Sequence, residues 1–132
     1  MFRKAEKRHI LVMDDAPGIQ RILTVHLQKD FEIVVKNDGM EGMEWLDAGH
    51  SVDLILADLD MPNLNGKEFL QIMRASNFYK HIPVIILSAE SESGERIDCL
   101  NKGADDFIEK PFNPAEVLAK IQVILRRYKG LE

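Results

Sequence analysis

Short apolar segments alternate with helical patterns along this chain, and that alternation restricts its fold more than any other feature. Apolar runs rich in Ile, Val and Leu occur at 9–13, 31–35, 52–57, 82–87 and 105–108. Apolar residues at helical spacing follow each run, at 16–29, 38–48, 66–75, 91–102 and 114–128. Strand–helix units repeated in this way predict a parallel sheet with helices on both faces. We therefore expect an α/β fold with a doubly wound, five-stranded parallel sheet.

The length of 132 residues fits one ordinary domain, which we place at 9–128. Segment 1–8 is basic and lacks the apolar stretch of a secretory signal, so we interpret it as a flexible tail. Segment 129–132 is interpreted as a C-terminal tail or the remnant of an expression vector.

Composition excludes several function classes. No apolar run approaches the roughly 20 residues that a membrane-spanning helix needs. The net charge of −5 gives no reason to expect direct binding of nucleic acid. The single cysteine, Cys99, is unable to form an internal disulfide and suits a reducing compartment. We expect a cytoplasmic protein without a membrane or nucleic-acid partner.

Polar residues stand where the predicted strands end. Asp14 and Asp15 follow the first strand, Asp58 the third, Ser88 the fourth and Lys110 the fifth. Ligands of such sheets bind outside the carboxyl ends of the strands. The sequence therefore predicts one cleft that combines three carboxylates with a hydroxyl and an ammonium group.

Three crowded carboxylates repel one another unless a cation lies between them. Oxygen ligands suit Mg²⁺, which takes one or two carboxylates and shares its site with phosphate; Mn²⁺ is a second candidate. A carboxylate can attack phosphorus and form an aspartyl phosphate. Lys110, Ser88 and the metal would then neutralise charge on the phosphoryl oxygens.

Four stretches of the chain resemble the signature segments of response-regulator receiver domains: ILVMDDAP, DLILADLDMPNLNG, VIILSAE and GADDFIEKPF. They stand in the order and spacing of that family, and the resemblance covers roughly residues 8 to 128. It implies a flavodoxin-like (βα)5 fold with strand order 2-1-3-4-5. It also implies a two-component or phosphorelay partner, either a sensor histidine kinase or a phosphotransfer protein.

The resemblance assigns individual roles. It implies that Asp58 is the phosphoacceptor and that Ser88 and Lys110 hold the phosphoryl group. Asp15, Asp58 and the backbone carbonyl of Asp60 would ligate the metal directly, with Asp14 acting through water. Slow loss of the phosphoryl group by hydrolysis is expected, rather than enzymatic turnover.

The resemblance also implies a switch. Phosphorylation in receivers draws the Ser88 hydroxyl inward, and an aromatic residue, here Phe107, moves into the vacated space. This changes the surface formed by helix 4, strand 5 and helix 5. The Lys110–Pro111 peptide bond is implied to be cis, which costs little only before proline.

Two departures from the family pattern stand out. Asp60 and Glu90 add negative charge beside the phosphoacceptor, and we expect them to slow phosphorylation by small anionic donors. Asp98 and Gln122 stand where DNA-binding receivers carry basic residues of a dimer interface, although Glu116, Lys120 and the pair Asp105–Asp106 remain. We therefore expect that particular dimer not to form. The output partner, or a fused effector domain, is not indicated.

Two alternatives from other classes remain open at this point. ILADLD resembles the nucleophile motif of haloacid-dehalogenase phosphatases, with Asp58 as nucleophile and Asp60 as acid–base. The acidic pair Asp14–Asp15 precedes this motif, however, whereas those enzymes carry it later. A flavodoxin-like cofactor module would need a glycine- or hydroxyl-rich phosphate loop after the first strand, where this chain has acidic residues.

Overall fold

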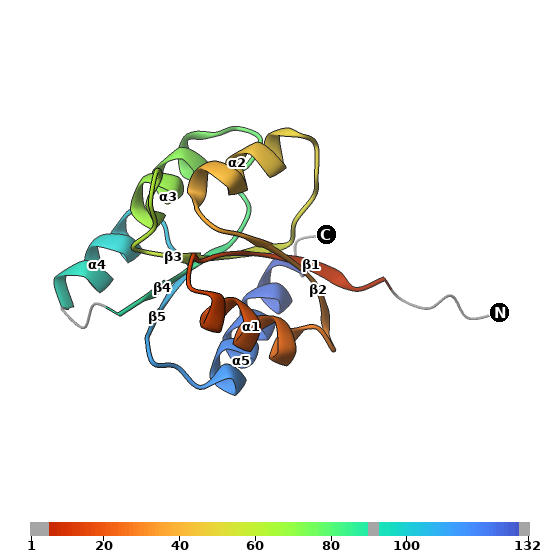
Figure 1. The fold of residues 1–132 in the computed structure, drawn as a ribbon. Coiled ribbons are helices and arrows are strands. Elements are labelled where there is room, and N and C mark those ends of the chain that lie inside the picture. The colour runs from red at the N-terminus through yellow and green to blue at the C-terminus, as the bar shows by residue number, and fades with distance from the viewer. Residues whose placement is uncertain (1–5, 90–92, 130–132) are drawn as a thin grey trace.

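The computed structural model describes residues 6–89 and 93–129 and has the alternating order that the sequence predicts (Figure 1). The strands are β1 (Arg8–Met13), β2 (Phe31–Lys36), β3 (Leu54–Asp58), β4 (Val84–Ser88) and β5 (Asp106–Glu109). The helices are α1 (Pro17–Leu27), α2 (Gly39–Asp47), α3 (Gly66–Ala75), α4 (Ser93–Asn101) and α5 (Pro114–Lys129).

The strands form one sheet in the order β2-β1-β3-β4-β5, with every neighbouring pair parallel, which confirms the predicted topology. Side chains on its two faces build two separate cores. One core packs the sheet against α2, α3 and α4, and the other packs it against α1 and α5. Figure 1 shows these two helical layers on opposite sides of the sheet.

The register of the sheet fixes which residues meet at its carboxyl edge. Met13 of β1 pairs with Ala57 of β3, so the residues that follow them, Asp14 and Asp58, emerge at the same level. Ser88 of β4 pairs with Glu109 of β5, which places Lys110 directly beyond that pair. The predicted convergence of strand ends therefore follows from backbone pairing alone.

Two strands differ from the predicted segments. β4 begins at Val84 rather than at residue 82, because Pro83 has no N–H to donate to the neighbouring strand. β2 ends one residue later than predicted, and its partly buried side chains pack against both cores. It is the edge strand, and only Phe31 of its residues is buried.

In α4 the helical spacing of the apolar residues Ile97 and Leu100 favours a position on the inner side of the helix. The structure exposes them, at 56% and 38%, and buries Cys99 instead. A helix of nine residues with polar side chains between its few apolar ones does not define its inner face from sequence alone. The predicted start at residues 91 and 92 lies outside the described residues.

The ends of the domain lie close to the predicted boundaries. β1 begins at Arg8, which the sequence assigned to the tail, and the Arg8 guanidinium donates to the Leu125 carbonyl of α5 at 3.4 Å. α5 extends to Lys129. Among the described residues, no helix is both long and apolar enough to cross a membrane.

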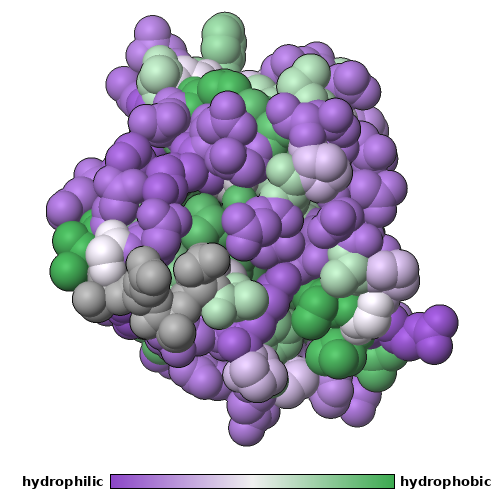
Figure 2. Space-filling model, turned by 60° about the vertical axis from the view of Figure 1, so that its left-hand side comes forward, coloured by the Kyte–Doolittle hydropathy of each residue, from purple (hydrophilic) through white to green (hydrophobic). Residues whose placement is uncertain are grey.

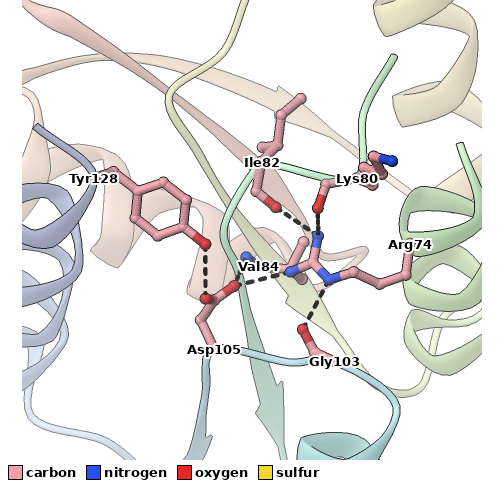
Figure 3. Close-up of polar contacts among 7 residues, drawn as sticks. All are labelled: Arg74, Lys80, Ile82, Val84, Gly103, Asp105 and Tyr128. Atoms are coloured by element: carbon pink, nitrogen blue, oxygen red, sulfur yellow. Dashed lines mark hydrogen bonds and ion pairs between the residues drawn. The ribbon is translucent and has the colours of Figure 1, made fainter. Parts of the chain in front are cut away.

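A hydrogen-bonded cluster around Arg74 joins the two helical layers at the amino-terminal edge of the sheet (Figure 3). Arg74 of α3 donates to the carbonyls of Gly103 (2.9 Å), Lys80 (3.1 Å) and Ile82 (2.7 Å). It also pairs with the Asp105 carboxylate at 2.9 Å. That carboxylate accepts from the Tyr128 hydroxyl of α5 at 3.1 Å.

Candidate functional site

Three carboxylates meet at the carboxyl edge of the sheet. One oxygen each from Asp14, Asp15 and Asp58 lies within 4.8 Å of the others. Asp14 and Asp58 are buried, whereas Asp15 is exposed. The loop after β1 begins with a local turn, because Asp14 Oδ1 accepts from the Ala16 amide at 2.9 Å. Oxygen ligands at this spacing, with one side open to water, suit a hard divalent cation such as Mg²⁺.

Lys110 places its ammonium group between two of these acids. Its Nζ lies 2.8 Å from Asp14 Oδ2 and 3.2 Å from Asp58 Oδ1. Burial lowers the pKa of Lys110, but its hydrogen bond to Asp14 and the charges of Asp14 and Asp58 outweigh burial and raise that pKa overall. Lys110 therefore stays charged at neutral pH. The Lys110–Pro111 peptide bond that follows is cis.

The pKa of Asp58 is raised above the usual aspartate value. Burial is the largest cause and the charge of Asp14 the next, while Lys110 acts in the opposite direction. The charged form of Asp58 is thus less stable in the metal-free protein than in water. A cation at the acid cluster would favour the ionised carboxylate, which is the form that acts as a nucleophile.

Ser88 and Asp60 lie beside this cluster in different ways. Ser88 is fully buried at the end of β4, and its carbonyl accepts from the Lys110 amide at 2.7 Å. The Asp60 amide points toward Asp58 Oδ1 at 3.4 Å. Among the described residues, the acid cluster does not include the exposed Asp60 side chain. Glu90 lies outside the described residues.

Phe107 is only 1% exposed and belongs to the core beneath α3 and α4. Arg96 of α4 covers it: the Arg96 guanidinium carbon lies 5.9 Å from the centre of the Phe107 ring. Arg96 also donates to the Phe107 carbonyl at 3.4 Å. The position of this aromatic ring is therefore coupled to that of α4.

Sequence reasoning missed a set of polar residues that fix the loops of the site: Gln20, Asn37, Asp38 and Asn63. Only Asp38 gave a signal, since Asp followed by Gly and, three residues later, Glu41 is typical of a helix start. The contacts of the other three depend on how the loops meet in space.

The molecular face on the side of α4 is mostly hydrophilic, and its hydrophobic areas are small and separate (Figure 2). β4 ends and α4 begins on this side of the molecule (Figure 1). Among the described residues of this visible face, an apolar ligand would find no large apolar patch.

Comparison with known proteins agrees with this geometry. The family model described as "Response regulator receiver domain" matches residues 10–122. The response regulator GtcR of Aneurinibacillus migulanus is 44% identical over 119 residues, covering 89% of this chain and 48% of that protein. The response regulator ArlR of Staphylococcus aureus is 36% identical over 119 residues, covering 89% of this chain and 52% of that protein. The chain thus spans about half the length of these relatives.

Solved structures show the same fold. The receiver domain of the Francisella response regulator 1452 superposes with a TM-score of 0.85 at 31% identity, covering 92% of this chain and 99% of that one. The chemotaxis response regulator CheY4 of Vibrio cholerae superposes with a TM-score of 0.83 at 28% identity, covering 90% and 99%. These matches give the phosphatase alternative no support.

Proposed function

Because this chain belongs to the response-regulator receiver domain family, we propose that Asp58 is its phosphoacceptor and that a histidine kinase or phosphotransfer protein supplies the phosphoryl group. One observation carries the assignment to this residue. Asp58 belongs to the acid cluster, lies 3.2 Å from the Lys110 ammonium and stands at the end of the central strand β3.

The proposed reaction is a phosphoryl transfer between two side chains. An Asp58 oxygen attacks the phosphorus of the donor's phosphohistidine, and the N–P bond breaks as the new O–P bond forms. The imidazole nitrogen keeps the electron pair of that bond and takes up a proton. Lys110 is charged and already beside Asp58, so it neutralises part of the charge on the phosphoryl oxygens.

The acid cluster fits a divalent cation, with Mg²⁺ the first candidate and Mn²⁺ the second. Asp15 and Asp58 would hold it, together with the backbone carbonyl of Asp60, and Asp14 would act through water. When bound, the metal would supply positive charge opposite the phosphoryl oxygens. Asp14 meanwhile keeps Lys110 in place through their 2.8 Å ion pair.

Phosphorylation of Asp58 would be detected by a partner through a change in α4 and β5. Ser88 would bind a phosphoryl oxygen, and Phe107 would respond to that movement beneath Arg96 of α4. The relatives are about twice as long as this chain, so an output partner or a fused effector domain is part of the proposal. A cytoplasmic location follows from the same proposal, because histidine kinases draw on cytoplasmic ATP. Slow hydrolysis of the aspartyl phosphate, rather than turnover of a substrate, would end the signal.

The test is phosphorylation of the purified chain by acetyl phosphate, or by a phosphorylated kinase domain, in the presence of Mg²⁺. Intact-mass spectrometry should show one added phosphoryl group, which hydroxylamine removes because it cleaves acyl phosphates. Asp58→Asn should abolish the modification, and chelation of the metal should suppress it.

Asp30→Asn is the matched control, because Asp30 is exposed in the turn between α1 and β2, at the opposite edge of the sheet. This variant should be modified as the wild type is. Stable modification of Asp58→Asn at the wild-type level would overturn the assignment.

A further inference from the structure

The turn between β2 and α2 touches both loops that carry the acid cluster, although it contributes no carboxylate to that cluster. We call residues 36–39, from the last residue of β2 to the first residue of α2, the β2–α2 corner. On one side its Lys36 carbonyl accepts from the Asp14 amide in the loop after β1, which also contains Asp15. On the other side it contacts the loop after β3, which follows Asp58. β2 is the edge strand, so this corner lies outside the convergence of strand ends described above.

Asp38 is the centre of the corner. Its side chain is 5% exposed, and each of its carboxylate oxygens has a separate partner. Oδ1 accepts from the Glu41 amide at 2.9 Å and caps α2. Oδ2 accepts from the Asn63 side-chain amide at 2.8 Å. These bonds lower the pKa of Asp38, with the Glu41 bond the largest cause, so the carboxylate is charged at neutral pH.

The backbone reinforces the contact with the loop after β3. The Gly39 amide donates to the Leu64 carbonyl at 3.2 Å. A Cβ atom at residue 39 would lie only 2.7 Å from that carbonyl oxygen, so the close approach requires glycine. Asn63 itself has a φ of 67°, a conformation that Asn and Asp tolerate better than other non-glycine residues.

The other side of the corner reaches the loop after β1 through Gln20 of α1. The Gln20 side-chain amide donates both to the Asp14 carbonyl and to Asn37 Oδ1, the latter at 2.9 Å. The Asp14 amide also donates to the Lys36 carbonyl at 3.1 Å. The loops after β1 and β3 are therefore each hydrogen-bonded to the same short segment.

We propose that the β2–α2 corner is a positioning element for the phosphorylation site, with Asp38 and Asn63 as positioning residues that set the spacing between Asp14–Asp15 and Asp58. The inference rests on the proposed function, because the ligand it serves is the divalent cation at the acid cluster. Groups hydrogen-bonded directly to metal ligands typically change metal affinity about 10- to 100-fold when they are replaced. Asp38 and Asn63 act one step further from the ligands, so we expect the lower end of that range.

The Asp38–Asn63 pair allows a reciprocal test. Asp38→Asn keeps an oxygen for the α2 cap, and Asn caps helices as well as Asp does. It turns an NH2 group toward Asn63, however, so the charge-assisted bond between the loops is lost, and rotation of the Asn63 amide restores only a neutral bond, which is about half as strong. Asn63→Asp alone sets two carboxylates against each other. The double variant Asp38→Asn with Asn63→Asp restores one donor and one acceptor and leaves the net charge unchanged.

Calorimetric titration with Mg²⁺ should show affinity lowered by about tenfold or more in each single variant and recovered in the double variant. Thermal unfolding separates this effect from a general loss of stability, since the cap remains in Asp38→Asn. Wild-type affinity in Asp38→Asn, or no recovery in the double variant, overturns the proposal.

Amide NMR spectra of the metal-free proteins test, independently of metal binding, whether Asp38 positions the loops of the acid cluster. Asp38→Asn should shift the amide signals of residues 14, 15 and 58–60, and the double variant should return them toward the wild-type positions. If these signals do not move, the corner does not position the site. If the wild type binds no Mg²⁺, the proposed function itself fails, whatever the spectra show.

Discussion

Asp14 and Asp58 are both buried, and one lysine ammonium lies between them within ion-pair distance of each. The metal-free site therefore holds more negative than positive charge in a place where water reaches poorly. The raised pKa of Asp58 expresses this imbalance, with burial as its largest cause. This excess of negative charge favours the binding of a cation. It also lowers the free energy of unfolding of the metal-free protein.

Replacing Asp58 with Asn should stabilise the metal-free protein at neutral pH, because it removes the buried charge. Because burial and the charge of Asp14 both raise the pKa of Asp58, we expect the free energy of unfolding of Asp58→Asn to exceed that of the wild type. In the wild type, the ionised Asp58 destabilises the folded protein at pH values above its raised folded-state pKa. This penalty disappears below the unfolded-state pKa, because the carboxyl group is then protonated in both states. The difference between the proteins should therefore shrink as the pH falls through that window, as urea unfolding can measure.

Addition of Mg²⁺ provides the control for this prediction. The cation should stabilise the wild type by binding its folded state, and should stabilise Asp58→Asn much less. A variant that is less stable than the wild type in metal-free buffer at neutral pH would contradict the charge imbalance described above.

Asp60→Asn should accelerate phosphorylation by acetyl phosphate, because the exposed Asp60 carboxylate adds negative potential where an anionic donor approaches. An interaction of up to about 1 kcal/mol between such screened charges corresponds to roughly two- to fivefold in rate. The gain should decline as ionic strength rises. Initial rates at two salt concentrations measure both effects, and an unchanged rate at low salt would refute the expectation.

At the scale of secondary-structure elements, α4 is held to α3 by charge as well as by its short apolar face. Lys67 of α3 pairs with Glu95 at 2.8 Å and with Asp98 at 2.9 Å. The hydrogen bonds that Lys67 donates to Glu95, and next to Asp98, raise the pKa of Lys67 well above its usual range. Lys67 also follows Gly66, whose amide donates to the Leu59 carbonyl. The bridge therefore links α4 to the segment that follows Asp58.

Lys67→Met should loosen α4 while leaving the other helices in place. Exposed or partly exposed ion pairs contribute little, so a loss of up to about 1 kcal/mol is expected. Hydrogen exchange followed by mass spectrometry should become faster in α4 and remain unchanged in α1. Lys120→Met, which removes the pair with Asp106 at 3.2 Å, serves as the matched control. If the α4 amides exchange equally slowly in Lys67→Met and in the wild type, the Lys67 ion pairs do not stabilise α4.

At the scale of the whole molecule, the two helical layers are joined at the sheet edge opposite the acid cluster. Arg74 comes from α3 in one layer, Tyr128 from α5 in the other, and Asp105 lies between them (Figure 3). Burial, followed by the nearby charge of Asp105, raises the pKa of Tyr128, so its hydroxyl remains a donor. The orientation of the end of α5 is thus fixed relative to α3.

Arg74→Met should destabilise the whole domain, because it leaves three carbonyls and the Asp105 carboxylate without their guanidinium donor. We expect a loss of about 2 to 4 kcal/mol. Chemical unfolding measures it, and Arg21→Met, at an exposed position on α1, controls for the loss of a surface charge. Equal losses in the two variants would show that the cluster adds nothing specific.

On α4, a position where a dimer interface would lie is engaged within the chain itself. Asp98 stands where a dimer interface would need a basic residue, and the structure engages it with Lys67 and Lys102 of its own chain. We expect the protein to remain monomeric when beryllofluoride and Mg²⁺ occupy the site. Analytical ultracentrifugation tests this expectation, and a symmetric dimer through α4, β5 and α5 would refute it.

Much of this protein follows from local patterns in its sequence. The alternation of apolar runs with helical spacing determined the five strands, the five helices and the parallel sheet, because side-chain periodicity is a property of neighbouring residues. The acidic and basic residues of the site could be predicted for a related reason. Strand ends of a parallel sheet lie at one edge, so Asp14, Asp58 and Lys110 converge wherever the register allows.

Tertiary structure alone decided the remaining features. It turned Ile97 of α4 outward, made β2 a partly exposed edge, and brought Asp38 against Asn63, 25 residues later in the chain. Such contacts depend on the angles at which loops and helices meet after the sheet has formed. Packing of the whole chain sets those angles, and a hydrogen bond changes completely with a shift of one ångström. No local pattern of residues carries that information.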